Sequence, residues 1–411
     1  MVLAVLLMPM TFYQSTGRNI ENTFSNVSRD QVNITHLIHG NDSELGVKQC
    51  YSYCFFKLNF VGPPSDLNMC LVPVNDALYN RAGPVARCLQ STRKELIATI
   101  VRWVGGGGSH LICWLNGPAG SGKLAVSQTV AEWCAANNRL ATSFFFFRGA
   151  GNRSNITHFI PTLAYQLSLS VPATKPLLQR VLQSEPSIAR QLLRHQFNKL
   201  MIEPILAVRK PILDILALRK PMAIVIDALN ECKDKDLMVE FIMIIIDAFR
   251  DNHRLPFQVF FTSRVEEHIW RKLEAPPAHS AIYPLALQDF DARVDIRTFF
   301  KSHFSTIYEE NHRVLQNLLR PWPSDSDLEA LVQKSDGSFI FVVTLINFIN
   351  DGTDLPHRKI QGALGVNAGL DPLYTQLLRA VIILNGLLAP SCFLAPPCLS
   401  ILSDICFSSK L

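Results

Sequence analysis

The feature that most constrains this chain is an apolar segment that runs directly into a glycine-rich turn. Residues 111–124 read LICWLNGPAGSGKL. The first half is typical of a short buried strand, and the second half matches G-x-x-x-x-G-K-[ST] except at its last position. Glycine permits backbone conformations that side chains disfavour, so several N–H groups of such a turn can point at one polyphosphate. The segment therefore predicts a phosphate-binding loop.

The last residues of this loop have separable roles. Lys123 can reach the β- and γ-phosphates, and the helix expected after it offers the positive end of its dipole. Leu124 stands where a Ser or Thr would bind Mg²⁺. The predicted nucleotide-binding residues are Gly117, Pro118, Ala119, Gly120, Ser121, Gly122, Lys123 and Leu124.

Two later strand-like segments also end in polar residues. Residues 224–231 read IVIDALNE, which places Asp227 at the end of an apolar strand and Glu231 four residues further on. Ligands of open α/β sheets bind at the carboxyl ends of the strands. We therefore assign Asp227 to Mg²⁺, through water, and Glu231 to the catalytic polarisation of an attacking water.

The segment FFTSR at 260–264 places Arg264 at the end of a third strand, where it could contact the γ-phosphate and act as a catalytic residue. The alternative role of Arg264 is a surface salt bridge.

Short apolar runs alternate with amphipathic stretches over most of the chain. Strands are expected at 111–115, 141–147, 223–227 and 257–262. Helices are expected at 92–104, 123–136, 157–169, 173–183, 188–208 and 236–250. Strands that are apolar throughout indicate a parallel sheet covered on both faces. The predicted fold is α/β, a P-loop NTPase whose parallel sheet is flanked by helices, followed by a smaller all-helical lid region.

An internal repeat interrupts this alternation. Residues 204–213 (PILAVRKPIL) and 214–223 (DILALRKPMA) are near copies in tandem. Because proline cannot continue a helix, Pro211 and Pro221 are each expected to end one, which leaves a short helical piece over Ile212–Leu218. The repeat implies no chemistry.

Composition excludes some classes of function. Apolar residues make up 48% of the 411 residues, and the net charge of +5 is spread along the chain. Such a charge gives no case for a nucleic-acid partner. The ten cysteines are scattered, which indicates reduced thiols in a reducing compartment, with Cys113 and Cys134 in the core.

The two ends are apolar. Residues 1–10 have no basic residue before them and no clear cleavage site, which disfavours a signal peptide. Residues 380–403 are uncharged but interrupted by prolines, which favours a buried piece of a domain over the alternative of a membrane span. We expect a cytoplasmic protein. The final Ser-Lys-Leu at 409–411 leaves a peroxisomal address as the alternative.

The predicted domains follow from these patterns. Residues 1–82 form a variable, partly disordered N-terminal region, 83–285 the NTPase domain, 286–375 the helical lid region and 376–411 an apolar truncated tail.

Several motifs in this order carry a family resemblance. They read RCLQSTR at 87–93, WLNGPAGSGK at 114–123, VIDALNEC at 225–232, FTSR at 261–264 and DGSFIF at 336–341. The chain resembles a fungal NACHT protein, and more closely the nephrocystin-like N-terminal NTPase domain of the STAND class, over roughly residues 72–375. The resemblance implies a nucleotide-controlled signalling switch. A lid would close over bound ATP or GTP, and attached repeats or effectors would promote assembly with other protein chains.

The chain departs from this family in four ways. Leu124 replaces the hydroxyl that binds Mg²⁺, Asn230 replaces an acid, the repeat at 204–223 is extra, and the chain ends soon after the lid without recognisable sensor repeats. Loss of one Mg²⁺ ligand leaves nucleotide binding intact and impairs phosphoryl transfer, because the metal neutralises developing charge.

Three hypotheses follow: a nucleotide-binding switch with weak hydrolysis, an active ATPase in which water replaces the hydroxyl, and a truncated scaffold that binds no nucleotide. The lack of a guanine-reading N-K-x-D motif favours ATP over GTP.

Overall fold

The computed structural model describes residues 66–106, 110–212, 221–251, 255–274, 278, 281–318 and 320–365. All of them belong to one unit, Phe60–Leu411. The predictions for the first 65 residues, for most of the piece Ile212–Leu218 and for the tail lie outside the described residues.

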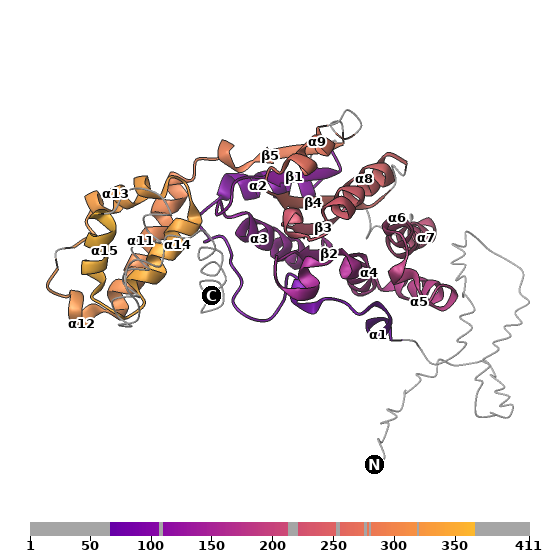
Figure 1. Cartoon of the computed structure of the whole chain (residues 1–411), viewed down its shortest axis with the longest axis horizontal. Coiled ribbons are helices and arrows are strands. Elements are labelled where there is room, and N and C mark those ends of the chain that lie inside the picture. Colours follow the sequence, from indigo (N-terminus) through magenta and orange to yellow (C-terminus); the bar gives the residue numbers. More distant parts are fainter. Residues whose placement is uncertain are drawn as a thin grey trace, which may run out of the picture. The chain divides into compact units, whose positions relative to one another are not determined.

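A five-stranded parallel sheet forms the centre of the α/β part (Figure 1). Its strands are β1 (Ile112–Asn116), β2 (Leu140–Phe145), β3 (Met222–Asp227), β4 (Phe257–Ser263) and β5 (Ile282–Ala286). Their order is β2-β3-β4-β1-β5. Strand β4 therefore lies between the strand that leads into the glycine turn and the strand that ends at Asp227. Their carboxyl ends meet at one edge of the sheet.

Strands β1 to β4 are buried on both faces because helices cover each face, whereas Pro284 of the edge strand β5 is exposed. Alternate residues of a strand point to opposite sides, so Trp114 packs in one core and Leu115 in the other. Helices α2 (Lys94–Val104) and α3 (Lys123–Ala136) cover the side of Leu115. Helices α4 (Phe159–Ser170), α6 (Leu193–Phe197) and α8 (Lys235–Asp251) cover the other side.

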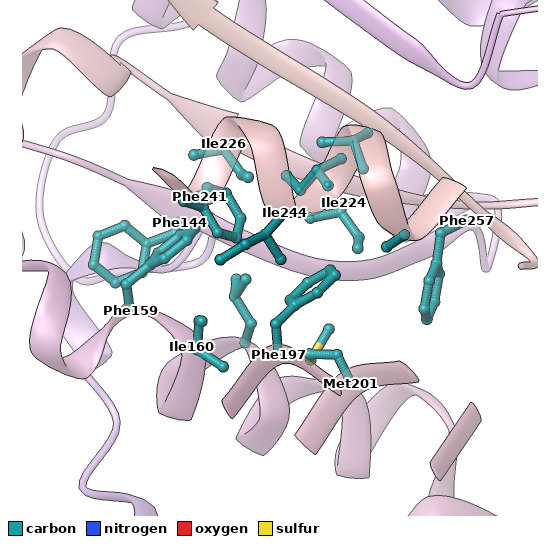
Figure 2. Packing of buried hydrophobic residues seen from close by; sticks show 14 of the residues in the cluster. Phe144, Phe159, Ile160, Phe197, Met201, Ile224, Ile226, Phe241, Ile244 and Phe257 are labelled. Atoms are coloured by element: carbon teal, nitrogen blue, oxygen red, sulfur yellow. The ribbon is translucent and has the colours of Figure 1, made fainter. Parts of the chain in front are cut away.

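Aromatic rings fill much of this second core. Figure 2 shows Phe144 of β2 beside Phe159 of α4, with Phe241 and Phe197 nearby. The rings of Phe144 and Phe159 meet edge to face with centroids 5.0 Å apart, and those of Phe159 and Phe241 do so at 4.7 Å. This is a favoured geometry for aromatic pairs. The apolar aromatic run after residue 140 is thus a core strand, as its composition predicts.

The other helices of the α/β part are α1 (Leu67–Leu71), α5 (Lys175–Ser184), α7 (Glu203–Ile212) and α9 (Glu267–Leu273). Leu67, Leu71 and Ala77 are buried in the same core as β2 and α4, although the sequence places them in a variable N-terminal region.

A group of helices follows the sheet (Figure 1). They are α11 (Arg293–Glu310), α12 (His312–Leu315), α13 (Asp325–Ser335), α14 (Phe339–Ile349) and α15 (Pro356–Gly365). Phe300, Leu331 and Leu345 belong to their shared core. Helix α13 begins where the Ser324 hydroxyl accepts a hydrogen bond from the Asp327 N–H, a standard N-cap. The predicted all-helical region after the sheet is confirmed.

One element was missed and one prediction was wrong. Strand β5 was not predicted; it contains Pro284, which is tolerated because β5 lies at the edge of the sheet. Helix α7 continues one residue past Pro211. A proline in the last turn removes only one of the helix's final hydrogen bonds, so it need not end the helix at once.

Cys113 and Cys134 are buried free thiols, as expected. None of the helices in the described ranges has the length and apolarity that crossing a bilayer requires.

Candidate functional site

The glycine turn follows β1 and leads into α3. Gly120 and Gly122 have φ angles of 72° and 93°, a region that favours glycine. The main-chain N–H groups of residues 119–125 donate no hydrogen bond to any described residue. Backbone donors at a helix start that lack protein acceptors are suited to phosphate oxygens. The predicted phosphate loop thus has the geometry of an anion cradle.

Lys123 folds back over this loop. Its Nζ donates to the carbonyl oxygens of Gly117 at 2.8 Å and of Pro118 at 2.6 Å. Burial lowers the pKa of Lys123 to about 8, and the nearby charge of Asp227 partly offsets this effect. A bound phosphate would have to replace these two carbonyls as the acceptor of the ammonium.

Leu124 lies in the first turn of α3 and its residue surface is 38% exposed. It offers no oxygen. The hydroxyl of α3 that reaches the end of β3 comes instead from Ser127, whose Oγ donates to Asp227 Oδ1 at 2.6 Å.

Asp227 is only 3% exposed at the end of β3. Its Oδ1 accepts a second hydrogen bond from Thr262 Oγ1 of β4, at 2.7 Å. Burial raises the pKa of Asp227, and the two hydroxyls, Lys123 and Arg81 act in the opposite direction. Within the described residues, hydrogen bonds to this carboxylate reach Oδ1 alone. The second oxygen is the one suited to a metal or its water.

The donor set can be compared with what Mg²⁺ requires. The described residues hold no cluster of three or more His, Cys, Asp or Glu side chains that could bind a metal. Mg²⁺ at NTPase sites usually takes one or two protein carboxylates and completes its shell with phosphates and water. Asp227 therefore fits a Mg²⁺ held mainly by nucleotide and water.

Glu231 follows in a short turn after β3. Its Oε2 accepts from the Arg148 N–H at 3.1 Å, and burial raises its pKa. The neighbouring Asn230 is buried, and its Oδ1 accepts from the Arg264 N–H at 2.9 Å while its carbonyl accepts from the Arg148 guanidinium at 3.0 Å. Asn230 thereby joins the loops that follow β2, β3 and β4.

Arg264 begins the segment after β4 and is exposed. The hydrogen bond from its N–H to Asn230 Oδ1 places it beside the turn that carries Glu231. No ion pair of Arg264 is found among the described residues.

Two arginines near the site were not predicted. Arg81 stacks over the Phe145 ring at 4.5 Å and donates to Gln128 Oε1 of α3, and burial lowers its pKa to about 10. Arg153 donates to the Phe145 carbonyl at 3.2 Å. The charges of both arginines couple to Asp227. No local motif marks either residue, because only the folding of the chain brings them to the sheet edge.

The helical region contacts the phosphate loop directly. The Ile340 N–H, in the first turn of α14, donates to the Gly120 carbonyl at 3.1 Å. A Cβ at Gly120 would lie 2.3 Å from Ile340 Cγ2, so only glycine permits this approach.

Arg93 forms a second link between the loop and the helical region. It is 5% exposed and donates to the Ser121 carbonyl at 3.2 Å. Its Nε lies 3.7 Å from Asp295 Oδ2 of α11, and its guanidinium stacks on the Phe339 ring at 5.1 Å. One buried cation thus contacts the loop, α11 and α14.

A family model matches the part of the chain that holds this site. Residues 93–264 match the family model described as "Nephrocystin 3, N-terminal". No curated protein matches the chain. Among solved structures, one titled "Structure of C. elegans PCH-2" is similar at 13% identity and a TM-score of 0.33; the match covers 66% of this chain and 65% of that one. So distant a likeness carries no argument about function. The glycine loop after β1 and the five-stranded parallel sheet are those of a P-loop NTPase-like α/β fold, and residues 93–264 of this chain are similar to the nephrocystin 3 N-terminal family.

Proposed function

We propose that this chain is a nucleotide-binding signalling switch of the NACHT/STAND type that prefers ATP to GTP and hydrolyses it weakly. The observation that carries the proposal is the row of N–H groups at residues 119–125, which donate to none of the described residues, together with the Nζ of Lys123 at the same loop. These donors match a triphosphate, and the family match supports the same assignment.

The residues around the cradle have distinct roles in this proposal. Lys123 binds the β- and γ-phosphates, and Asp227 holds a water of the Mg²⁺ shell. Glu231 accepts a proton from the attacking water, for which its raised pKa brings it closer to neutral pH. Arg264 stabilises charge on the γ-phosphate. Mg²⁺, when bound, neutralises phosphate charge.

Weak hydrolysis follows from the residue at position 124. Leu124 supplies no ligand, so the metal would be held by the nucleotide phosphates and by water, with Asp227 as the carboxylate that positions its water shell. An active ATPase is the second candidate, favoured by the placement of both Asp227 and Glu231 at the same sheet edge.

The switch part of the proposal rests on the contacts of α14 and Arg93 with the loop. The Gly120 carbonyl accepts from the Ile340 N–H, and the Ser121 carbonyl accepts from Arg93. A nucleotide that reorders the loop therefore moves both acceptors. Binding energy can thereby shift the position of the helical region. Other protein chains that assemble with this one would then recognise the shifted state.

Binding and turnover distinguish these candidates. We expect the purified protein to bind a fluorescent ATP analogue and Lys123→Ala to bind it at least tenfold more weakly, since the variant loses a charge-assisted contact. Weak steady-state turnover supports the switch, and sustained turnover supports the ATPase. A wild-type protein that binds neither ATP nor GTP would leave only a scaffold role.

A further inference from the structure

We propose that Ser127 is the positioning residue for Asp227, and that it supplies from one turn further along α3 the orienting hydrogen bond that position 124 cannot provide. The inference rests on the proposed nucleotide site. It assigns to Ser127 no contact with the metal itself.

The helical period places Ser127 suitably for this role. It lies three residues after Leu124 and four after Lys123, so it is one helical turn from each of them. Ser127 is fully buried, and its Oγ donates to Asp227 Oδ1 at 2.6 Å. A hydrogen bond to a buried carboxylate is among the stronger ones in proteins.

A second hydroxyl of the same helix behaves differently. Thr129 Oγ1 donates to the Ala125 carbonyl at 2.8 Å, which is the usual bond of a helical hydroxyl to the preceding turn. Ser127 does not make the equivalent bond and is directed at the sheet edge instead. The direction of its hydroxyl is therefore set by the tertiary contact with Asp227.

Thr262 completes the arrangement from the other side. Its Oγ1 accepts the Ala228 N–H at 2.9 Å and donates to Asp227 Oδ1 at 2.7 Å. Two hydroxyls from two different elements thus occupy the lone pairs of one carboxylate oxygen. This fixes the rotation of the carboxylate and leaves Oδ2 for the water shell of Mg²⁺.

The test separates metal-dependent from metal-independent affinity. We would titrate the full chain with mant-ATP in Mg²⁺ and in EDTA. The Mg²⁺-dependent gain is the ratio of the mant-ATP affinity in Mg²⁺ to that in EDTA. Loss of a hydrogen bond to a metal-holding carboxylate typically weakens metal affinity by about 10–100-fold, so this ratio should be smaller by about tenfold or more in Ser127→Ala. Its affinity in EDTA should stay unchanged, because the N–H cradle and Lys123 are intact.

Three further variants control the interpretation. Thr129→Ala removes a hydroxyl of the same helix that does not touch Asp227, and it should keep the Mg²⁺-dependent gain. Ser127→Thr retains the hydroxyl and should keep most of that gain. In the double variant Ser127→Ala/Leu124→Ser, a hydroxyl at 124 should restore it. Circular dichroism and thermal unfolding establish that each variant is folded.

The outcomes are distinguishable. If the wild type binds mant-ATP and Ser127→Ala keeps the full Mg²⁺-dependent gain, the role of Ser127 is wrong while the nucleotide site stands. If Ser127→Ala does not fold, Ser127→Thr decides the question. A folded Ser127→Thr that loses the Mg²⁺-dependent gain in affinity, and otherwise behaves like Thr129→Ala, also overturns the role. If the wild type binds no mant-ATP in either buffer, the proposed function fails and this inference fails with it.

Discussion

The contact between Gly120 and Ile340 makes a quantitative prediction about how the helical region is held on the phosphate loop. A Cβ at Gly120 would lie 2.3 Å from Ile340 Cγ2, whereas two carbons in contact are about 3.5–4.0 Å apart. Gly120→Ala must therefore separate the two segments by more than about 1 Å. The left-handed backbone at Gly120 (φ 72°) adds strain for any L-residue, about 1–2 kcal/mol.

The expected magnitude follows from these two causes. Overpacking costs about 1–3 kcal/mol, so Gly120→Ala should lower the free energy of unfolding by about 2–5 kcal/mol in total. Ile340→Ala removes the methyl group that clashes most, and leaves Ile340 Cβ 3.0 Å from the added Cβ. The double variant should therefore recover most of the overpacking part, which gives a coupling energy of about 1–3 kcal/mol in a double-mutant cycle measured by urea unfolding.

Gly122→Ala is the matched control for this cycle. Gly122 also has a positive φ, 93°, but its added Cβ would meet Phe339 Cδ2 at an ordinary 3.8 Å. It should lose only the backbone strain of about 1–2 kcal/mol and show no coupling to Ile340. Additive effects of Gly120→Ala and Ile340→Ala would mean that α14 does not rest on the loop in solution, and the reasoning about the switch would be refuted.

Three other predictions concern the charges and the metal site. The pKa of Lys123 is lowered to about 8, and only the protonated form of this side chain attracts phosphate. ATP affinity should therefore be highest below pH 8 and fall as the pH rises through that value; an ATP affinity that stays constant between pH 7 and 9 would contradict this. Arg93→Ala removes the contacts with Ser121 and Asp295, so hydrogen exchange should rise at the start of α14 and ATP should dissociate faster, with unchanged exchange as the contrary result. Leu124→Ser adds an oxygen ligand at a 38% exposed position, so turnover and its Mg²⁺ dependence should rise at little cost in stability; a variant with wild-type kinetics would show that the missing hydroxyl does not limit hydrolysis.

Local sequence predicts the part of the site that one continuous segment builds. The run from β1 through the glycine turn to α3 is predictable because backbone freedom at glycine, the apolar strand and the helix start all lie within 26 residues, 111–136. Asp227 is predictable for the same reason, since it ends an uninterrupted apolar strand. Alternation of strands and helices predicts the parallel sheet, because strands buried on both faces must be apolar throughout.

Other features exist only because distant segments meet. Ser127 and Asp227 are 100 residues apart, and no pattern around Ser127 distinguishes it from a core-facing helical serine. Arg81 and Arg93 precede the loop in the sequence, yet the charge of Arg81 acts on Asp227 and Arg93 donates to the Ser121 carbonyl of the loop. Strand β5 contains Pro284, a residue that argues against a strand in the middle of a sheet. It is tolerated because β5 lies at the edge, and only the strand order reveals that position.

The amino-acid sequence by itself thus determined the phosphate loop, the acid at the end of β3 and the α/β class, because backbone conformation and hydrophobic period are local properties. Tertiary structure alone decided which hydroxyls hold Asp227, which arginines surround it and which helix covers Gly120. Hydrogen bonds and packing act over a few ångströms in space, irrespective of separation along the chain, so only the folded arrangement specifies them.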